Sequence, residues 1–446
     1  MSDLLAARSQ MAMSLAFHIV FACAGMAMPL LMVLAERRYH RKKDPLDLEL
    51  ARRWARGTAI LFAVGAVSGT VLSFELGLLW PEFMRFAGPV IGMPFSLEGF
   101  AFFLEAIGLG LYLYGWKRLS PRVHLAAGWL VLASGVASGL FVVTANAWMN
   151  TPTGFTLDAA GKIADVDPIA AMLNPAALTQ CLHMIIAAFV AVGFAVAGIH
   201  AWRLRKHPGS AFDRRALGLA LAVGGVAAVL QPISGDLSAK HLAEHQPVKL
   251  AAMEGHWETQ RCAPLHLGGI PDEEDEVTRF AIAIPCGLSI LAHLDPDAEV
   301  MGLKDVPRDL RPPVLITHLA FQVMVGIGVL LMFTALYAAF HRWRKKVMPT
   351  GRRFLALLVL CGPLGFVAVE AGWFVTEVGR QPWVVHGLMK TADAVTPMPG
   401  LVVPFLVFSA LYVVLAIMVV VLLRRHVFRA PTAPDAVAPS EVPHAG

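Results

Sequence analysis

Residues 401–424 read LVVPFLVFSALYVVLAIMVVVLLR, an apolar run whose first charged side chain is Arg424. A stretch of about 20 apolar residues is long enough to cross a bilayer as a helix. Eight further runs of this kind lie upstream, at about residues 12–35, 58–80, 95–116, 124–148, 178–202, 216–234, 313–340 and 353–377. None shows the two-residue alternation of barrel strands, so the sequence predicts an all-α integral membrane protein with nine transmembrane helices.

Charged residues are scarce and unevenly placed. The 446-residue chain is 57% hydrophobic and 15% charged, whereas soluble domains have about 25% charged residues. Of the 37 Lys and Arg residues, 25 lie in the connections after predicted helices 1, 3, 5 and 7 and in the C-terminal tail. This positive-inside pattern predicts an N-terminus outside and a C-terminus in the cytoplasm. The net charge of +5 therefore reflects topology, and no nucleic-acid partner is expected.

The longest connection, about residues 235–312, is predicted to be an outer binding loop within a membrane domain of residues 1–425. It contains Cys262 and Cys286, whose pairing stays open because sequence spacing alone cannot establish a disulfide. The remaining residues, 426–446, are rich in Ala and Pro and are predicted to form a disordered cytoplasmic tail.

Residues 369–383, VEAGWFVTEVGRQPW, place three notable side chains at the end of a predicted helix. A carboxylate such as that of Glu377 is costly in an apolar setting unless a cation, a proton or a metal compensates it. Trp373 precedes it by about one helical turn and Arg380 follows it by about one turn, so the three can share a face. Pro382 ends the helix because it lacks an amide donor. The stretch indicates charge chemistry at a membrane edge.

Three further side chains lie in the outer halves of predicted helices, on the same side as Glu377. His18 is expected about one turn into the first helix, His183 about one turn into the fifth, and Met324 about three turns into the seventh. Imidazole and thioether groups are common haem ligands, and a His/Met pair gives a low-spin centre of raised potential. Ordinary packing is the alternative for each side chain. For Met324 packing is the stronger interpretation, because the chain has 19 methionines.

A second polar set indicates a proton path. Glu98 and Glu105 are seven residues apart, hence on one face of the third predicted helix and about 10 Å apart along its axis. Carboxylates inside a membrane without a local cation are typical of proton relays. His124, Ser138 and Asn146 on the next helix would extend this track from the inner side toward the outer side. For Ser138 alone, helix packing beside glycines is the stronger interpretation.

The long loop opens with Gln246-Pro-Val-Lys-Leu-Ala-Ala-Met-Glu-Gly255 and so carries Lys249 and Glu254. A cation and an acid in a lipid-facing cleft suit a quinol, whose hydroxyl groups must lose protons as electrons leave. Glu254 would act as the base, and Lys249 would hold an oxygen. The alternative is an ordinary solvated ion pair on a loop, which contributes little.

Together these segments resemble subunit I of the cytochrome bd-type quinol oxidases, over about residues 1–425. The matching segments are Arg8 with His18, Glu98-Gly through Phe-Phe-Leu-Glu105, Asn146-Ala-Trp-Met-Asn-Thr-Pro152, His183, Gln246 to Gly255, Phe321-Gln-Val-Met-Val-Gly-Ile-Gly328, and Gly372-Trp through Gly379-Arg-Gln-Pro-Trp383. Their order and spacing together make the resemblance specific.

The resemblance implies a fold and a set of haem ligands. The fold would consist of two four-helix bundles plus one peripheral helix. His183 and Met324 would be the axial ligands of the low-spin haem b558. His18 and Glu377 would hold the two high-spin haems, b595 and d, without an assignment of one to the other.

The resemblance also assigns roles to the surrounding residues. Trp373 would lie between haems, and Arg380 would offset the charge of a propionate or of Glu377. Lys249 and Glu254 match the family's quinol-binding loop. The positions that match proton delivery toward the oxygen site are Glu98, Glu105, His124, Ser138 and Asn146.

One departure concerns Gln322, which stands where the better-known branch of the family has an arginine near haem b558. The missing charge changes the potential expected for that haem. The long loop is also of the family's short type. Both features resemble the branch called cyanide-insensitive oxidases, some of which carry haem b in place of haem d. Because the same ligands accept either macrocycle, the second high-spin haem is expected to be d or b.

The expected enzyme is the catalytic subunit of a terminal respiratory oxidase in the bacterial cytoplasmic membrane. It would oxidise ubiquinol or menaquinol at the outer face and reduce O2 to water with cytoplasmic protons, which builds a proton-motive force without pumping. Its expected partners are subunit II and a small single-helix subunit. Two alternatives stay open: an electron-carrying b-type anchor of a dehydrogenase, and a proton- or ion-coupled transporter that uses Glu98, Glu105 and Glu377.

Overall fold

The computed structural model describes residues 2–428, and within them nine helices are long and apolar enough to cross a membrane. These helices are α1 (Asp3–Lys42), α2 (Pro45–Leu79), α3 (Pro81–Tyr114), α4 (Pro121–Asn150), α6 (Ala177–Lys206), α7 (Ala211–His245), α10 (Val314–Lys345), α11 (Arg352–Val378) and α13 (Val402–His426). The predicted all-α membrane class and the number of spans are confirmed for this part of the chain. Residues 429–446, most of the predicted tail, lie outside the described residues.

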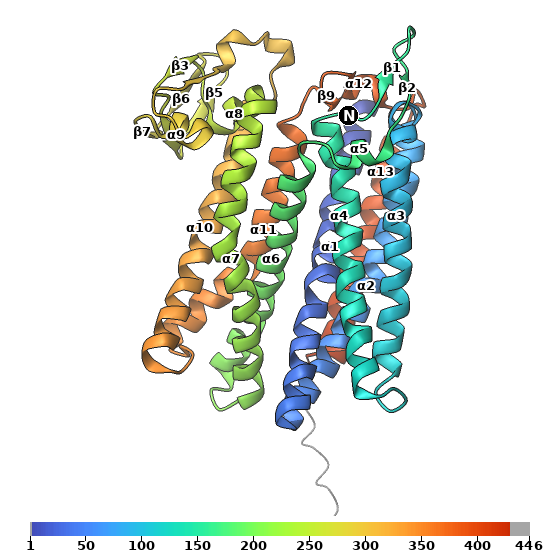
Figure 1. Ribbon diagram of the computed structural model, residues 1–446, viewed down its shortest axis with the longest axis vertical. Helices are drawn as coiled ribbons and strands as arrows, with labels where there is room; N and C mark the ends of the chain where they lie inside the picture. Colours follow the sequence, from blue (N-terminus) through green and yellow to red (C-terminus); the bar gives the residue numbers. More distant parts are fainter. Residues whose placement is uncertain (1, 429–446) are drawn as a thin grey trace, which may run out of the picture.

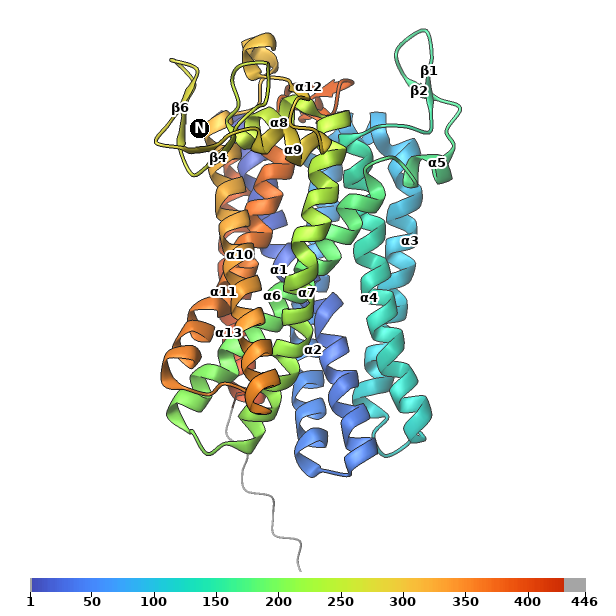
Figure 2. The same ribbon diagram turned by 60° about the vertical axis from the view of Figure 1, so that its left-hand side comes forward.

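The spanning helices run side by side along the long axis of the molecule (Figures 1 and 2). In one set of four, α1 and α3 each pack against both α2 and α4. In another set of four, α6 and α10 each pack against both α7 and α11. Helix α6 also contacts α1 and α4 and so joins the two sets, whereas α13 packs against α1 and α2.

Small residues allow the helices of the second set to approach closely. A Cβ on Gly193 would lie 2.4 Å from Cα of Gly224, and a Cβ on Gly198 would lie 2.8 Å from Cα of Gly362. Either contact would be a clash between backbones, so these crossings require glycine. The largest apolar cluster surrounds them and runs through α1, α6, α7 and α11, which places the core where the two sets of helices meet.

The short elements gather at the end of the helices that also holds the N-terminus (Figure 1). Between α4 and α6 lie β1 (Thr156–Leu157), β2 (Ile163–Ala164) and α5 (Pro168–Met172). The long loop holds α8 (Pro247–Glu254), β3 (Gln260–Arg261), β4 (Leu265–Leu267), β5 (Ile270–Asp272), β6 (Val277–Arg279), β7 (Ile282–Ile284), α9 (Gly287–His293), β8 (Glu299–Val300) and two 3-10 turns at Leu303–Asp305 and Arg308–Leu310. Before α13 come β9 (Trp383–Val385), β10 (Met389–Lys390) and α12 (Thr391–Ala394). The strands pair two by two and antiparallel, as β1–β2, β3–β8, β4–β7, β5–β6 and β9–β10.

Several helix boundaries differ from the sequence prediction, and three of them bear on predicted residues. Helix α1 begins at Asp3, so His18 lies about four turns into the helix and not one. Helix α3 begins directly after Trp80, so Arg85 belongs to a helix and not to a loop. Helix α7 continues to His245, well past the predicted start of the long loop. In each case the helix extends through polar and charged residues that hydropathy assigns to connections.

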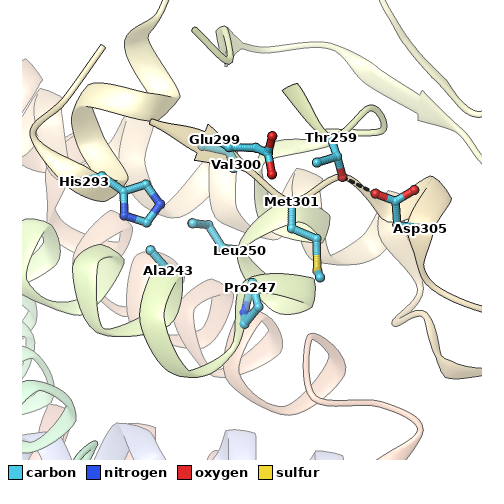
Figure 3. Close-up of a pocket in the computed structure, with 9 residues that line it drawn as sticks. All are labelled: Ala243, Pro247, Leu250, Thr259, His293, Glu299, Val300, Met301 and Asp305. Atoms are coloured by element: carbon cyan, nitrogen blue, oxygen red, sulfur yellow. Dashed lines mark hydrogen bonds between the residues drawn. The ribbon is translucent and has the colours of Figure 1, made fainter. Parts of the chain in front are cut away.

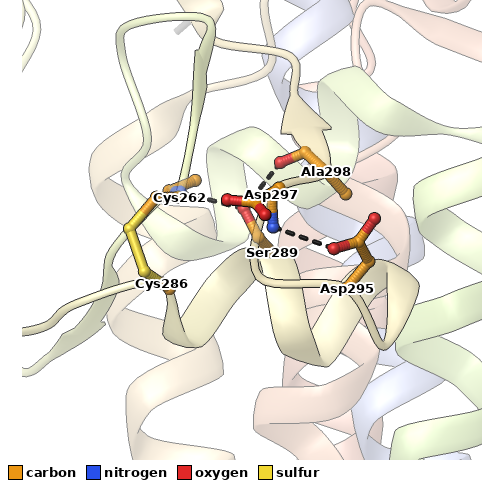
Figure 4. Close-up of a disulfide and its surroundings, with 7 residues drawn as sticks. Cys262, Cys286, Ser289, Asp295, Asp297 and Ala298 are labelled. Atoms are coloured by element: carbon orange, nitrogen blue, oxygen red, sulfur yellow. Dashed lines mark hydrogen bonds between the residues drawn. A yellow bond between two sulfur atoms is a disulfide. The ribbon is translucent and has the colours of Figure 1, made fainter.

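The long loop is closed by a disulfide between Cys262 and Cys286, which settles the pairing that the spacing left open (Figure 4). Beside it, the buried hydroxyl of Ser289 accepts a hydrogen bond from Ala263 N at 2.9 Å and donates one to Ala298 O at 2.8 Å. Helix α9 packs on α7, and β5 packs on α10. The loop is therefore a folded cap that rests on the ends of two spanning helices.

Candidate functional site

Glu377 lies in the last turn of α11, and both of its carboxylate oxygens have partners. Oε2 accepts a hydrogen bond from Arg380 Nη2 at 2.6 Å, and Oε1 accepts one from Asn146 Nδ2 at 2.6 Å. The arginine side chain is 1% exposed and the glutamate side chain 31% exposed. Trp373, one turn earlier, packs half-buried against the core cluster. The cation expected to compensate Glu377 is thus in place.

A chain of hydrogen bonds connects Glu377 to the long loop. Asn146, which bonds Glu377, accepts at Oδ1 a hydrogen bond from Asn150 Nδ2 at 3.2 Å. Asn150 Oδ1 in turn accepts one from Lys249 Nζ at 2.9 Å. Lys249 Nζ also donates to the carbonyl of Thr376 at 3.0 Å. These bonds join α4, α8 and α11 at one point.

His183 lies nearly two turns into α6, slightly deeper than predicted, and its ring faces α7. Its Nδ1 is 3.0 Å from Ser234 Oγ. That hydroxyl donates its one hydrogen to the carbonyl of Gln231 at 2.8 Å, which favours a hydrogen on Nδ1 for the His–Ser bond. Nε2 then carries the lone pair. The amide nitrogen of Gln231 lies 3.2 Å from Nδ1 and 3.0 Å from Nε2, so it must turn away before Nε2 can bind a metal.

The same arrangement recurs at His18 on α1. Its Nδ1 is 2.9 Å from the hydroxyl of Ser68 on α2. That hydroxyl is 3.0 Å from the carbonyl of Val64 and 3.1 Å from that of Gly65, and it donates its hydrogen there. His18 therefore also carries its hydrogen on Nδ1 and presents a lone pair on Nε2. A histidine oriented through one ring nitrogen, with the other available, is typical of metal ligands.

Glycines on neighbouring helices leave room beside two of the predicted ligands. A Cβ on Gly69 of α2 would lie 3.0 Å from His18 Cε1. A Cβ on Gly372 of α11 would lie 3.1 Å from Met324 Sδ. Carbon atoms in contact are normally about 3.5–4.0 Å apart, so alanine at Gly69 would press directly on the His18 ring.

The whole of this architecture matches one family. Residues 6–431 match the family described as cytochrome bd terminal oxidase subunit I. The chain belongs to this family. As a bd oxidase subunit I it is an oxidoreductase, the catalytic subunit of a haem-containing quinol oxidase that also includes a subunit II. Membership removes the transporter and the dehydrogenase anchor from consideration.

Individual relatives cover almost the full length of this bd oxidase subunit. A Bacillus subtilis (strain 168) protein named "Putative cytochrome bd menaquinol oxidase subunit I" is 39% identical over 443 residues, which are 98% of this chain and 99% of the relative. Cytochrome bd-II ubiquinol oxidase subunit 1 of Escherichia coli (strain K12) is 28% identical over 504 residues, 97% of this chain and 98% of the relative. The solved bd oxidase from Geobacillus thermodenitrificans superposes with a TM-score of 0.90 at 42% sequence identity. The match covers 96% of this chain and 99% of the solved chain.

The side chains of this bd oxidase subunit fit haem. His18 and His183 each present Nε2, and Met324 presents a thioether, which are established haem ligand types. Glu377 keeps further lone pairs beyond its two hydrogen bonds. Arg380 is 3% exposed, and its Nε and Nη1 have no partner within residues 2–428. Buried guanidinium donors of this kind suit an anion such as a haem propionate.

The predicted proton track of the bd oxidase begins at two acids of α3. Glu105 is 5% exposed, and its Oε1 has no hydrogen-bond partner in the described part of the chain. A Cβ on either Gly25 or Gly135 would lie 3.3 Å from that oxygen, so the carboxyl occupies a space that glycines of α1 and α4 leave open. Glu98, two turns away, and Ser138, beside Gly135 on α4, are half-buried.

At the other end of the helices, His124 has a partner that the sequence did not indicate. Its Nδ1 is 2.8 Å from Glu36 Oε1 on α1, and its Nε2 is 2.9 Å from the carbonyl of Tyr112. Glu36 is 1% exposed, and its Oε2 has no partner among residues 2–428. No hydrogen bond in that range links His124 directly to Ser138 or Asn146, and Asn146 donates to Glu377, so the track along α4 stays a prediction.

Lys249 and Glu254 do not lie on the surface of the loop. They are 5% and 1% exposed, so the solvated ion pair is wrong, whereas the quinol cleft stays a prediction. Neither Glu254 oxygen has a partner within residues 2–428. Burial raises the pKa of Glu254 to about 8. Burial, with a contribution from the Arg380 guanidinium, lowers the pKa of Lys249 to about 7. Both groups can therefore exchange protons near neutral pH.

A pocket of about 360 Å³ opens beside α8 (Figure 3). It lies where the end of α7, the start of α8 and strand β8 meet. Its lining combines apolar Pro247, Leu250 and Met301 with polar His293 and Glu299. Sites for small organic molecules share this size and this mixture of side chains.

Gln322 fastens α10 to the long loop. Its Nε2 donates to His266 O at 2.9 Å, and its Oε1 accepts from Gly268 N at 3.1 Å. One turn earlier, buried His318 bonds the carbonyls of Met253 and Gly268 at 2.8 and 3.1 Å. The glutamine that replaces the arginine of the other family branch thus has both ends engaged by loop backbone.

Four residues of the site were missed from the sequence: Glu36, Ser68, Asn150 and Ser234. Asn150 stands inside the segment that begins with Asn146, and their i, i+4 spacing was a signal that the two share a face. Ser68 and Ser234 had no such signal, because each lies about 50 residues from the histidine that it orients.

Proposed function

We propose that this bd oxidase subunit oxidises quinol at the outer side of the membrane and reduces O2 to water with cytoplasmic protons, without pumping. The observation that carries the proposal is the chain of hydrogen bonds from Glu377 through Asn146 and Asn150 to Lys249. It joins a predicted haem ligand to the predicted quinol loop. The excess of basic residues at the opposite end supports an outer position for this loop.

For the haem sites, we propose His183 and Met324 as ligands of haem b558. His18 and Glu377 would hold the two high-spin haems, b595 and either d or a second b. Bound haem would supply electron transfer and the iron position at which O2 is reduced. The Nδ1–H tautomer set by a serine at both histidines supports this assignment. It leaves Nε2 available at His18, and at His183 it does so once the Gln231 amide turns away.

For quinol oxidation, Glu254 is the proposed base. Its unpartnered, buried carboxyl can accept a quinol proton once it is ionised, and its pKa of about 8 allows release near neutral pH. The pocket beside Pro247 and Leu250 is the proposed place of the quinol ring, because these residues share with Glu254 the i, i+4 and i, i+7 spacing of one α8 face. Lys249 would then link this site to Glu377 rather than touch the quinol at the surface.

For proton delivery, Glu36 and His124 are the proposed entry from the cytoplasmic end. Both are buried, and they share a hydrogen bond of 2.8 Å. Glu105 and Glu98 would carry protons farther, in the direction of the oxygen site. Ser138 stays a proposed member on α4, whereas Asn146 is assigned to the Glu377 network.

The test is the reduced-minus-oxidised visible spectrum of the purified complex, with pyridine-haem analysis. Glu377→Ala is expected to remove a high-spin signal and to leave the low-spin bands, whereas His183→Ala is expected to remove the low-spin bands. The control is Glu244→Ala, an acid of α7 whose side chain is 79% exposed. Loss of only the low-spin bands in Glu377→Ala would refute the assignment. The same spectrum distinguishes haem d from a second high-spin haem b.

A further inference from the structure

A separate buried polar cluster consists of Gln10, Ser14, Glu75 and Tyr412. Its members come from α1, α2 and α13, and their exposed fractions are 1%, 0%, 2% and 4%. Glu75 Oε1 accepts hydrogen bonds from Gln10 Nε2 and from Ser14 Oγ, both at 2.9 Å. Tyr412 of α13 lies near enough to Glu75 for an electrostatic interaction. None of these four residues belongs to the proposed haem, quinol or proton-delivery sites.

Three polar atoms of the cluster have no hydrogen-bond partner within residues 2–428. They are Glu75 Oε2, Gln10 Oε1 and the hydroxyl of Tyr412. A buried water needs two to four polar partners, and buried polar groups without a protein partner usually have one. These atoms therefore point to an internal water that is shared by α1, α2 and α13.

Among residues 2–428, no cation pairs with Glu75. The groups that face it from α1 are the neutral Gln10 and Ser14, and the titratable group that faces it from α13 is Tyr412. The charged groups nearest along the chain are exposed Arg8 on α1 and, at the start of α3, half-buried Glu82, which pairs with exposed Arg85. An unpaired buried carboxylate is costly, so the charge of Glu75 must depend on another charge in the interior.

The cluster adjoins the site of His18 on two helices. Ser14 precedes His18 by one turn of α1, and Ser68, the partner of His18, precedes Glu75 by two turns of α2. Positions four and seven apart lie on one helix face. The interface between α1 and α2 that carries the His18–Ser68 bond thus continues directly into the Glu75 cluster.

We propose that Glu75, with Gln10, Ser14, Tyr412 and one internal water, is a proton-holding site coupled to the haem at His18. The inference rests on the proposed function, which makes His18 a haem ligand. Reduction of a haem held by His18 would add one negative charge to the interior, and the Glu75 carboxylate would offset that charge by taking up one proton through the internal water. When the electron leaves, the proton returns to that water. The interior thereby keeps the same net charge in both oxidation states.

The experiment is a redox titration of the haem at His18 over a range of pH, with a reduced-minus-oxidised infrared spectrum. Full coupling to one proton changes the reduction equilibrium tenfold per pH unit, which is 59 mV for a one-electron couple. Glu75→Gln is expected to lower this pH dependence and to remove a carboxyl band that appears on reduction. Glu82→Gln, at a half-buried acid that pairs with exposed Arg85 outside the cluster, is the matched control and should change neither. If Glu75→Gln retains both the pH dependence of the potential and the carboxyl band, the proposal is overturned, and Glu75 only stabilises the packing of α1 against α2.

Tyr412→Phe keeps the test informative if Glu75→Gln does not assemble. Removal of the hydroxyl is expected to shift the carboxyl band without removing it, and an unshifted band counts against the cluster. His18→Ala distinguishes failure of the haem assignment from failure of the proton-holding role of Glu75. If all haem signals persist in His18→Ala, the proposed haem assignment has failed; if one haem is lost while Glu75→Gln behaves as wild type, only the proton-holding role has failed.

Discussion

Gly69→Ala is expected to displace His18, whereas Gly77→Ala on the same helix is not. A Cβ on Gly69 would lie 3.0 Å from His18 Cε1 and 3.7 Å from both ring nitrogens. Contact at the normal separation requires the ring to retreat by roughly 0.5–1 Å. Such overpacking costs about 1–3 kcal/mol, and the better helix propensity of alanine offsets about 1 kcal/mol of it. The net loss of stability is therefore about 0–2 kcal/mol.

The functional effect should exceed the loss of stability, because ligand geometry tolerates only about 0.5 Å. Moving the ring also strains the 2.9 Å bond from His18 to Ser68. Haem content and the high-spin absorption bands of the purified complex measure the effect. A Cβ on Gly77 would meet nothing within 4 Å, so Gly77→Ala should leave the spectrum intact and raise the melting temperature slightly. Identical spectra for both variants and the wild type would refute the placement of His18 as a ligand.

Lys249→Met is expected to lower kcat more than it raises KM for quinol, because Nζ bonds Asn150 and a carbonyl of α11 and not the surface; a rise in KM alone would return Lys249 to the quinol site. Glu254 accepts protons only when ionised, so with its pKa raised to about 8 the rate should increase as pH rises through that value. Glu254→Gln should abolish this increase and slow turnover by about 10²–10⁴-fold; an unchanged pH profile would exclude Glu254 as the base. Replacing both Cys262 and Cys286 by Ser opens a crosslink of 24 residues, worth about 3 kcal/mol, and limited proteolysis should then cut the loop faster than in the wild type.

Much of the fold followed from the sequence because hydropathy acts locally. Nine apolar runs of about 20 residues specify nine spans without knowledge of their neighbours. Helix ends were less predictable, since α7 continues past Gly235 and Asp236 through polar residues that pack under the loop. Long-range partners were not predictable at all. Nothing in the sequence around Ser234 signals a bond to His183, and nothing around Asn150 signals Lys249, because both depend on how separate helices are placed.

The candidate site shows the same division. Residue types singled out His18, Met324 and Glu377, since imidazole and thioether are common haem ligands and a buried carboxylate needs a compensating partner. Only the family resemblance made them haem-ligand candidates. The burial of Lys249 and Glu254 could not be predicted from the sequence. Lys249 and Glu254 belong to a polar-looking loop segment, yet the loop folds back on α10 and encloses both, which changes their proton affinities and their proposed roles.

The junction between α2 and α3 consists of Trp80 alone. Its amide bonds the carbonyl of Leu76 at 3.3 Å, and its carbonyl accepts a hydrogen bond from Met84 N at 3.0 Å. A linker of one residue cannot stretch while one helix moves and the other stays, so neither helix can enter or leave the bilayer alone. The two must insert as one hairpin during synthesis. In the mature protein any tilt of α2, which holds Ser68, is transmitted to α3 and its acids, so the support of one predicted haem ligand and the predicted proton track are parts of a single mechanical unit.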